Sequence, residues 1–97
     1  MIALKLNNEF SFAIERCEKR ARLIVYKNGL EDVCRKETFG NLQRFILADQ
    51  GHLFKGRLQL DKNEGNIKVE VKGELIGIIN NDDFGDFLED VKNQLFL

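Results

Sequence analysis

One order of elements occurs twice along the 97 residues, and it restricts the possible folds more than any single motif does. In each half, segments with strand periodicity precede an amphipathic helix. Thr38 is a good N-cap for the first helix, and Gly51 is placed to end it. Both helices are predicted by apolar residues three and four positions apart. These residues are Phe39, Leu42, Phe45 and Ile46 in the first half, and Phe84, Phe87, Leu88, Val91 and Leu95 in the second.

Three strands are predicted before each helix. In the first half they cover about residues 10–15, 22–26 and 30–36, and alternation at residues 2–6 predicts a short leading strand. Asn28-Gly29 lies between two apolar segments and is the strongest short-range signal for a hairpin turn. In the second half, strands are predicted at about 54–60, 67–72 and 75–79.

The two helix openings can be aligned with each other. Residues 38–42 read Thr-Phe-Gly-Asn-Leu and residues 83–87 read Asp-Phe-Gly-Asp-Phe, which is a shift of 45 residues. The glycine turn before the last strand recurs at a shift of 44, at Gly29 and Gly73. These similar shifts predict an internal duplication of a strand-strand-strand-helix unit, with halves of about 1–51 and 52–97.

This pattern predicts one α+β domain over residues 1–97. We expect one or two antiparallel sheets, with both amphipathic helices packed on one face. Neither half has enough residues to bury a sufficient core alone. No linker rich in Pro or Ser separates the halves.

Composition restricts the classes of function. Fifteen Lys and Arg oppose sixteen Asp and Glu, and the net charge of −1 argues against broad, nonspecific binding of nucleic acid. No apolar run approaches the roughly 18 residues that cross a bilayer. The first residues lack the apolar core of a signal peptide. We therefore expect a cytoplasmic protein, in which Cys17 and Cys34 are reduced; the sequence leaves open whether they ever pair.

Few residues could support catalysis. The chain has one Ser (Ser11), one His (His52) and two Cys, and no nucleophile motif surrounds any of them. Two Cys and one His also lack the spacing of a zinc site, and the scattered glycines match no phosphate-binding loop. We expect a protein that is not an enzyme and that has no catalytic residues, metal or cofactor.

Two charged clusters are the candidate binding sites. The first is an acidic run at the start of the second helix, which suits a basic partner. Its residues are Asp82, Asp83, Asp86, Glu89 and Asp90. The second cluster surrounds the first hairpin turn and suits a phosphate backbone. Its residues are Arg16, Lys19, Arg20 and Arg22, opposed by Glu15 and Glu18. Either cluster is also consistent with an ordinary solvated surface.

The duplicated order is similar to the plan of Whirly and PUR-type single-stranded nucleic-acid-binding proteins. The chain also resembles the small immunity proteins encoded beside bacterial toxins, including those of contact-dependent growth inhibition systems. That resemblance includes residues 54–61 (Phe-Lys-Gly-Arg-Leu-Gln-Leu-Asp) and 65–73 (Gly-Asn-Ile-Lys-Val-Glu-Val-Lys-Gly). It implies a cytoplasmic protein without catalysis of its own, which binds one toxin domain and blocks its active site.

The leading hypothesis is therefore an inhibitor that neutralises a cognate toxin, expected to be a nuclease, through the acidic run. In this hypothesis the five carboxylates mimic phosphates against a basic substrate cleft. The alternative is a single-stranded nucleic-acid-binding module that uses a sheet and the Arg16–Arg22 hairpin. A structural subunit or adaptor is a third possibility.

Overall fold

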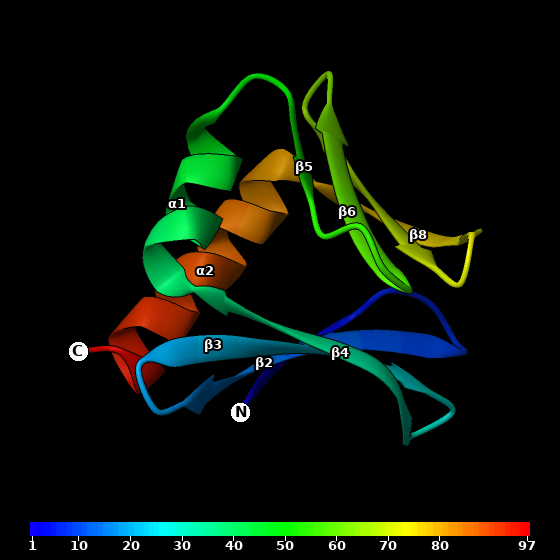
Figure 1. Ribbon diagram of the computed structural model, residues 1–97, viewed down its shortest axis with the longest axis horizontal. Helices are drawn as coiled ribbons and strands as arrows, with labels where there is room; N and C mark the ends of the chain where they lie inside the picture. The colour runs from blue at the N-terminus through cyan, green and yellow to red at the C-terminus, as the bar shows by residue number, and fades with distance from the viewer.

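The computed structural model describes residues 1–97, which form two antiparallel sheets and two helices (Figure 1). The strand order is β1-β2-β3-β4 in the first sheet and β5-β6-β7-β8 in the second. The first half consists of β1 (Ile2–Lys5), β2 (Phe10–Cys17), β3 (Arg20–Lys27), β4 (Leu30–Thr38) and α1 (Phe39–Leu47). The second consists of β5 (Gly51–Leu53), β6 (Leu58–Asn63), β7 (Asn66–Val71), β8 (Glu74–Asn80) and α2 (Asn81–Leu95).

The duplicated unit has four strands and one helix, one strand more than the sequence predicts. The short leading strand expected in the first half is β1. Its counterpart β5 was not predicted, because three residues are too few to show an alternating pattern. The expectation that Gly51 ends the first helix was wrong. Helix α1 ends at Leu47 with Ala48 as its C-cap, and Gly51 begins β5.

Three tight turns of the same form connect the hairpins. The turns at Asn28-Gly29, Glu64-Gly65 and Lys72-Gly73 each hold two residues at positive φ, between 52° and 54° in the first and between 82° and 83° in the second. Positive φ at both central residues matches the right-handed twist of the flanking strands. The hairpin predicted from Asn28-Gly29 is therefore confirmed.

The N-caps of the helices reveal the true offset of the duplication. Thr38 Oγ1 accepts a hydrogen bond from the Asn41 N–H, and Asn80 Oδ1 accepts one from the Asp82 N–H. The two caps are 42 residues apart. The buried residues Leu42 and Phe84 are separated by the same interval. The shift of 45 residues suggested by the repeated Phe-Gly pair was wrong by almost one helical turn, because Phe39 is one residue after its N-cap whereas Phe84 is four residues after its N-cap.

The expectation that both helices pack on one face is not confirmed, because each helix contacts strands of both sheets. The helices lie side by side, with the first sheet below them and the second sheet to their right in Figure 1. Helix α2 contacts β1 and β2 of the first sheet as well as β7 and β8 of the second, whereas α1 contacts β4, β5 and α2. Both helices therefore join the two sheets, and α2 does so through more of their strands. Neither helix combines the length and the apolar composition needed to cross a membrane.

A single core of 19 buried residues is formed by both sheets and both helices. Phe84 of α2 lies at its centre. The Phe84 ring centroid is 6.1 Å from that of Phe12 on β2, 6.3 Å from Phe87 on α2 and 6.5 Å from Phe45 on α1. These rings come from both halves of the chain, so each half completes the core of the other.

Candidate functional site

The five predicted acidic residues lie together on the solvent side of α2, and all five are exposed. At 100° per residue they fall within an arc of about 120°. Phe84, Phe87, Leu88 and Val91 lie on the opposite side of the helix and are buried in the core. We call the five residues, Asp82, Asp83, Asp86, Glu89 and Asp90, the acidic face. The core packing of α2 therefore holds these carboxylates at fixed positions on one surface.

None of the carboxylates on the acidic face forms an ion pair. The ion pairs of the protein all lie elsewhere, at Arg22–Glu15, Arg22–Glu31, Lys27–Glu9 and Lys72–Asp32, as does the contact between His52 and Asp61. Asp82 and Asp83 lie in the first turn of α2, where the helix dipole favours negative charge. That effect does not extend beyond the first turn to Asp86, Glu89 and Asp90. Helix stability alone therefore does not account for the whole acidic face.

The four residues of the predicted basic cluster have different surroundings in the structure. The Arg16 guanidinium donates to the carbonyl oxygens of Glu18 and, at 3.1 Å, of Leu95 at the end of α2. It also lies 5.5 Å from the centroid of the Phe96 ring. Arg16 therefore stabilises the C-terminus of a helix. Lys19 and Arg20 remain exposed on the β2–β3 hairpin.

Arg22 is occupied by ion pairs on the outer face of the first sheet. Its guanidinium donates to Glu15 on β2 at 2.7 Å and to Glu31 on β4 at 2.6 Å. These hydrogen bonds, that of Glu31 above all, raise the pKa of Arg22 above its ordinary value. Ile24 lies between Arg22 and Tyr26 on β3 and is fully buried, although it is not part of the main core. The two ion pairs of Arg22 therefore link β3 to both of its neighbouring strands, β2 and β4, within the first sheet.

A different basic cluster lies where the two sheets meet, and sequence reasoning missed it. Arg35 on β4 stacks on Phe54, with its guanidinium carbon 4.9 Å from the ring centroid. A Cβ on Gly56 would lie 2.7 Å from Arg35 Nη1, so this guanidinium lies against the loop that carries Lys55 and Arg57. We call Arg35, Lys55 and Arg57 the junction cluster. None of the three forms an ion pair. The pair Lys55/Arg57 was visible in the sequence, but its proximity to Arg35 was not.

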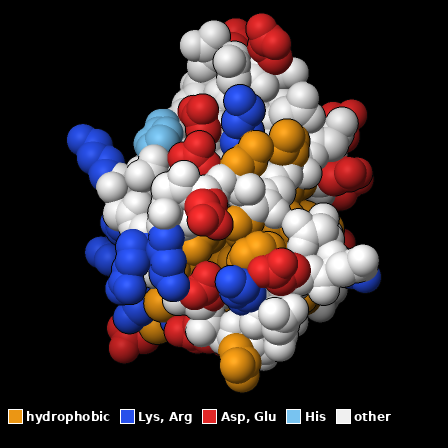
Figure 2. Space-filling model, turned by 90° about the vertical axis from the view of Figure 1, so that its right-hand side faces the viewer, with side chains coloured by type: hydrophobic (Ala, Val, Ile, Leu, Met, Phe, Trp, Pro, Cys, Tyr) orange, Lys and Arg blue, Asp and Glu red, His pale blue; other side chains and the backbone are white.

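The side of the molecule on which β8 lies has a mixed character. Figure 2 shows hydrophobic side chains near the centre of this side, bordered by acidic and basic side chains. Leu75 and Ile78 of β8 are both more than half exposed. This side of the molecule carries both positive and negative side chains, whereas the acidic face carries only negative ones.

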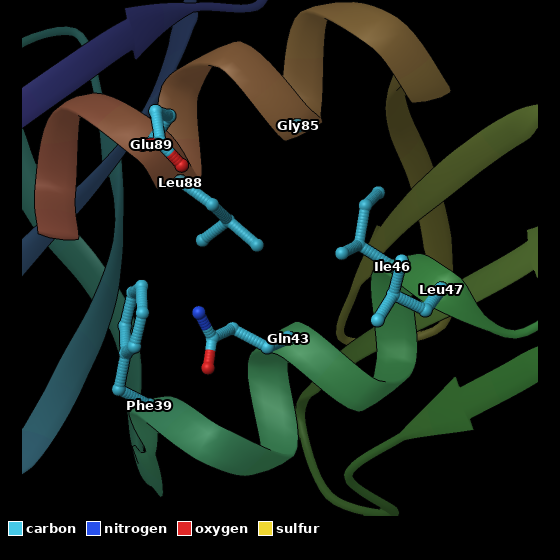
Figure 3. A pocket seen from close by; sticks show the side chains of 7 residues that line it. All are labelled: Phe39, Gln43, Ile46, Leu47, Gly85, Leu88 and Glu89. Carbon is cyan, nitrogen blue, oxygen red and sulfur yellow. The ribbon is translucent and has the colours of Figure 1, made fainter.

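A groove of about 290 Å³ separates α1 from α2 on their exposed side (Figure 3). Leu88 points from α2 toward the α1 wall, and Glu89 is the one predicted site residue at its border. The groove is lined by Phe39, Gln43, Ile46 and Leu47 of α1 and by Gly85, Leu88 and Glu89 of α2. The groove could not be predicted from the sequence, because a groove between two helices depends on how the helices pack.

The residues considered for catalysis are not brought together. His52 lies on β5 in the second sheet, with Nδ1 3.6 Å from Asp61 Oδ1, whereas Ser11 and both thiols lie in the first sheet. Cys17 pairs with Arg20 on β3 and Cys34 pairs with Ile24, so four residues along the strand and two strand spacings separate them. That separation of about 16 Å is too long for a disulfide. No group of three His, Cys, Asp or Glu side chains is placed to hold a metal ion.

No protein-family model, curated protein sequence or solved structure has detectable similarity to the chain. The resemblance to immunity proteins and to Whirly-type proteins therefore stays a prediction from the sequence pattern. What bears on function is the surface described above, which has an acidic helix face, an adjoining groove and a basic junction cluster.

Proposed function

We propose that the protein is a non-catalytic inhibitor of the immunity type, which binds and neutralises a cognate toxin domain through the acidic face of α2. The observation that carries the proposal is the grouping of five exposed, unpaired carboxylates on one helix face. We expect the partner to be basic, because complementary charge accelerates encounter and disfavours wrong partners. A nuclease fits this description, since its substrate cleft must attract phosphates.

The mechanism is electrostatic and steric. The acidic face extends over about 12 Å of helix, from Asp82 to Asp90. Carboxylates at this spacing compete with the phosphates of a nucleic acid for a cationic cleft. The body of the protein, at least 22 Å across in every direction, then blocks access to that cleft. Such an inhibitor acts in the cytoplasm, where a nuclease toxin would find its substrate.

The test is capture of the partner with matched charge variants. The tagged protein is expressed with its genomic neighbours, and the proteins that co-elute are identified by mass spectrometry. The variant Asp86→Lys/Asp90→Lys changes the net charge by four beyond the first turn of α2, so the dipole contribution to folding is spared. The control Glu64→Lys/Glu74→Lys makes the same change at two exposed, unpaired sites outside the helix.

We expect one stoichiometric, basic partner that is toxic when expressed alone. Its association rate should fall about tenfold or more with Asp86→Lys/Asp90→Lys, and with rising salt, because steering is screened over about 10 Å at 0.1 M. The control variant should retain most of the rate. Equal losses in both variants would show that only net charge matters, and an unchanged rate in the first would refute the acidic-face proposal.

The junction cluster favours a second candidate function, binding of single-stranded nucleic acid. Arg35 stacks on the aromatic ring of Phe54, and Lys55 and Arg57 on the adjoining loop are also unpaired cations, a combination suited to phosphates and bases. The test is fluorescence anisotropy with a labelled oligonucleotide at low salt. Binding that is salt-sensitive and lost in Arg35→Glu/Arg57→Glu would support this function, and no binding at low salt would exclude it.

A further inference from the structure

The groove between α1 and α2 is built from corresponding positions of the two repeats. With the structural offset of 42 residues, Gln43 corresponds to Gly85, and Ile46 corresponds to Leu88. Each wall therefore presents residues at positions i, i+3 and i+4 of its helix, the spacing at which side chains of one helix fit between those of another. The seven lining side chains surround the groove in Figure 3, and Leu47 at its border is 83% exposed.

Gly85 keeps this groove open. Its φ is not positive, and a Cβ placed on it would meet no atom within 4 Å. Neither backbone geometry nor close packing therefore requires glycine here. A glycine in a helix interior costs about 1 kcal/mol relative to alanine. The missing side chain leaves unfilled space between Ile46 and Leu88, which suits an apolar side chain supplied from outside.

The charges at the border specify what kind of segment fits. Glu89 lines the α2 wall, and Asp82 and Asp86 follow it on the helix surface as the next members of the acidic face. The α1 wall contributes the neutral Gln43. An occupant therefore meets apolar surface inside the groove and one carboxylate, Glu89, at its border, with Asp82 and Asp86 beyond it on the surface of α2. A basic amphipathic helix has both of the required faces.

We infer that the groove binds a basic amphipathic helix of the partner, with one or two apolar side chains inserted between α1 and α2 and Lys or Arg side chains against Glu89, Asp86 and Asp82. This inference rests on the proposed function, because the partner is the basic toxin domain. The volume of about 290 Å³ is about twice that of an engineered cavity of about 150 Å³ that binds benzene in another protein, so it can hold such side chains.

The experiment uses a defined probe, a fluorescent 14-residue peptide with Leu at positions i, i+4, i+7 and i+11 and mainly Lys elsewhere. Control peptides are the same composition in scrambled order, and the same pattern with Glu in place of Lys. Anisotropy titrations compare the wild type, Gly85→Leu and Gly40→Leu. The side chain in Gly85→Leu fills the groove. Gly40 lies outside it, and a Cβ there would meet only the end of Arg44 at 3.9 Å, so Gly40→Leu is the matched control.

We expect the Lys peptide to bind the wild type and Gly40→Leu alike, and to bind Gly85→Leu at least tenfold more weakly. Both control peptides should bind the wild type at least tenfold more weakly than the Lys peptide. Three results would each overturn the inference: no binding of the Lys peptide, equal binding by Gly85→Leu, or equal binding of the Glu peptide. Circular dichroism of both variants confirms that the comparison is between folded proteins.

The groove and the acidic face can fail independently in the capture experiment with the toxin. If Asp86→Lys/Asp90→Lys weakens toxin binding and Gly85→Leu does not, the proposed function stands and the groove inference is wrong. If the peptide results hold but no toxin co-elutes, the groove inference stands as a property of the surface and the proposed function fails.

Discussion

Phe84 and Phe39 occupy the same place in the repeated Phe-Gly sequence, yet the structure gives them different surroundings. Phe84 is fully buried and has three aromatic neighbours. Phe39 is half-buried at the start of α1 and stacks on Phe96 alone, with ring centroids 5.1 Å apart. Substitution of each by alanine therefore tests whether the repeat offset is 42, as the helices show, or 45, as the sequence suggests.

The structure predicts unequal losses of stability. A buried Phe→Ala substitution lowers the free energy of unfolding by about 3–5 kcal/mol. Because Phe84→Ala also loses three aromatic contacts, we expect a loss in the upper part of this range, at about 4–5 kcal/mol. For Phe39→Ala, half of a side-chain burial of about 1.5–3 kcal/mol and one aromatic pair of about 1 kcal/mol give a cost of about 2 kcal/mol. The free energy of unfolding of a natural domain is about 5–15 kcal/mol, so Phe84→Ala removes a large part of the stability.

The assay is urea unfolding followed by circular dichroism. With a slope of about 1 kcal/mol/M, the midpoint should fall by about 4 M for Phe84→Ala and about 2 M for Phe39→Ala. Should Phe84→Ala fail to fold, Phe84→Leu keeps most of the side-chain volume, and its expected cost is about 1–2 kcal/mol. Equal losses for the two alanine variants, or a loss below about 2 kcal/mol for Phe84→Ala, would refute the placement of α2 at the centre of the core.

Four further predictions concern single sites. Gly85→Ala should stabilise the protein by about 1 kcal/mol in urea unfolding, because its Cβ meets open space. Gly73→Ala should destabilise it by about 1 kcal/mol, because φ there is +83°. Arg22→Gln should cost about 1 kcal/mol, less at 1 M salt, because the ion pairs are partly exposed. Because the pKa of Arg22 is raised in the folded state, its contribution to stability is complete below the ordinary arginine pKa and is lost only as the pH rises through the raised value. Both lie far above pH 9, so this cost should not change between pH 7 and pH 9. A thiol assay after mild oxidation should still count two free thiols per chain, because Cys17 and Cys34 lie too far apart.

The grouping of the acidic face could be predicted from sequence, because it depends only on helix periodicity. Once residues 81–95 are helical, Asp82, Asp86 and Glu89 must lie on one side, and Phe84 and Phe87 on the other. The hairpin at Asn28-Gly29 and the cap at Thr38 are likewise local, since each depends on the conformation of a few neighbouring residues. The roles of Arg16 and Arg22 were not predictable in this way, because their partners include Leu95 and Glu31 on other elements.

The sequence by itself determined the helices, most of the strands, the duplication and the side of α2 on which the carboxylates lie, because each of these follows from spacing along one segment. Only the tertiary structure decided that the strands form two sheets, that both helices join them, and that Arg35 reaches the loop carrying Lys55 and Arg57. It also decided that Gly85 faces the empty space beside α1. The physical reason is that these features arise where segments far apart in the chain exclude water together, and no local pattern records which segments will meet.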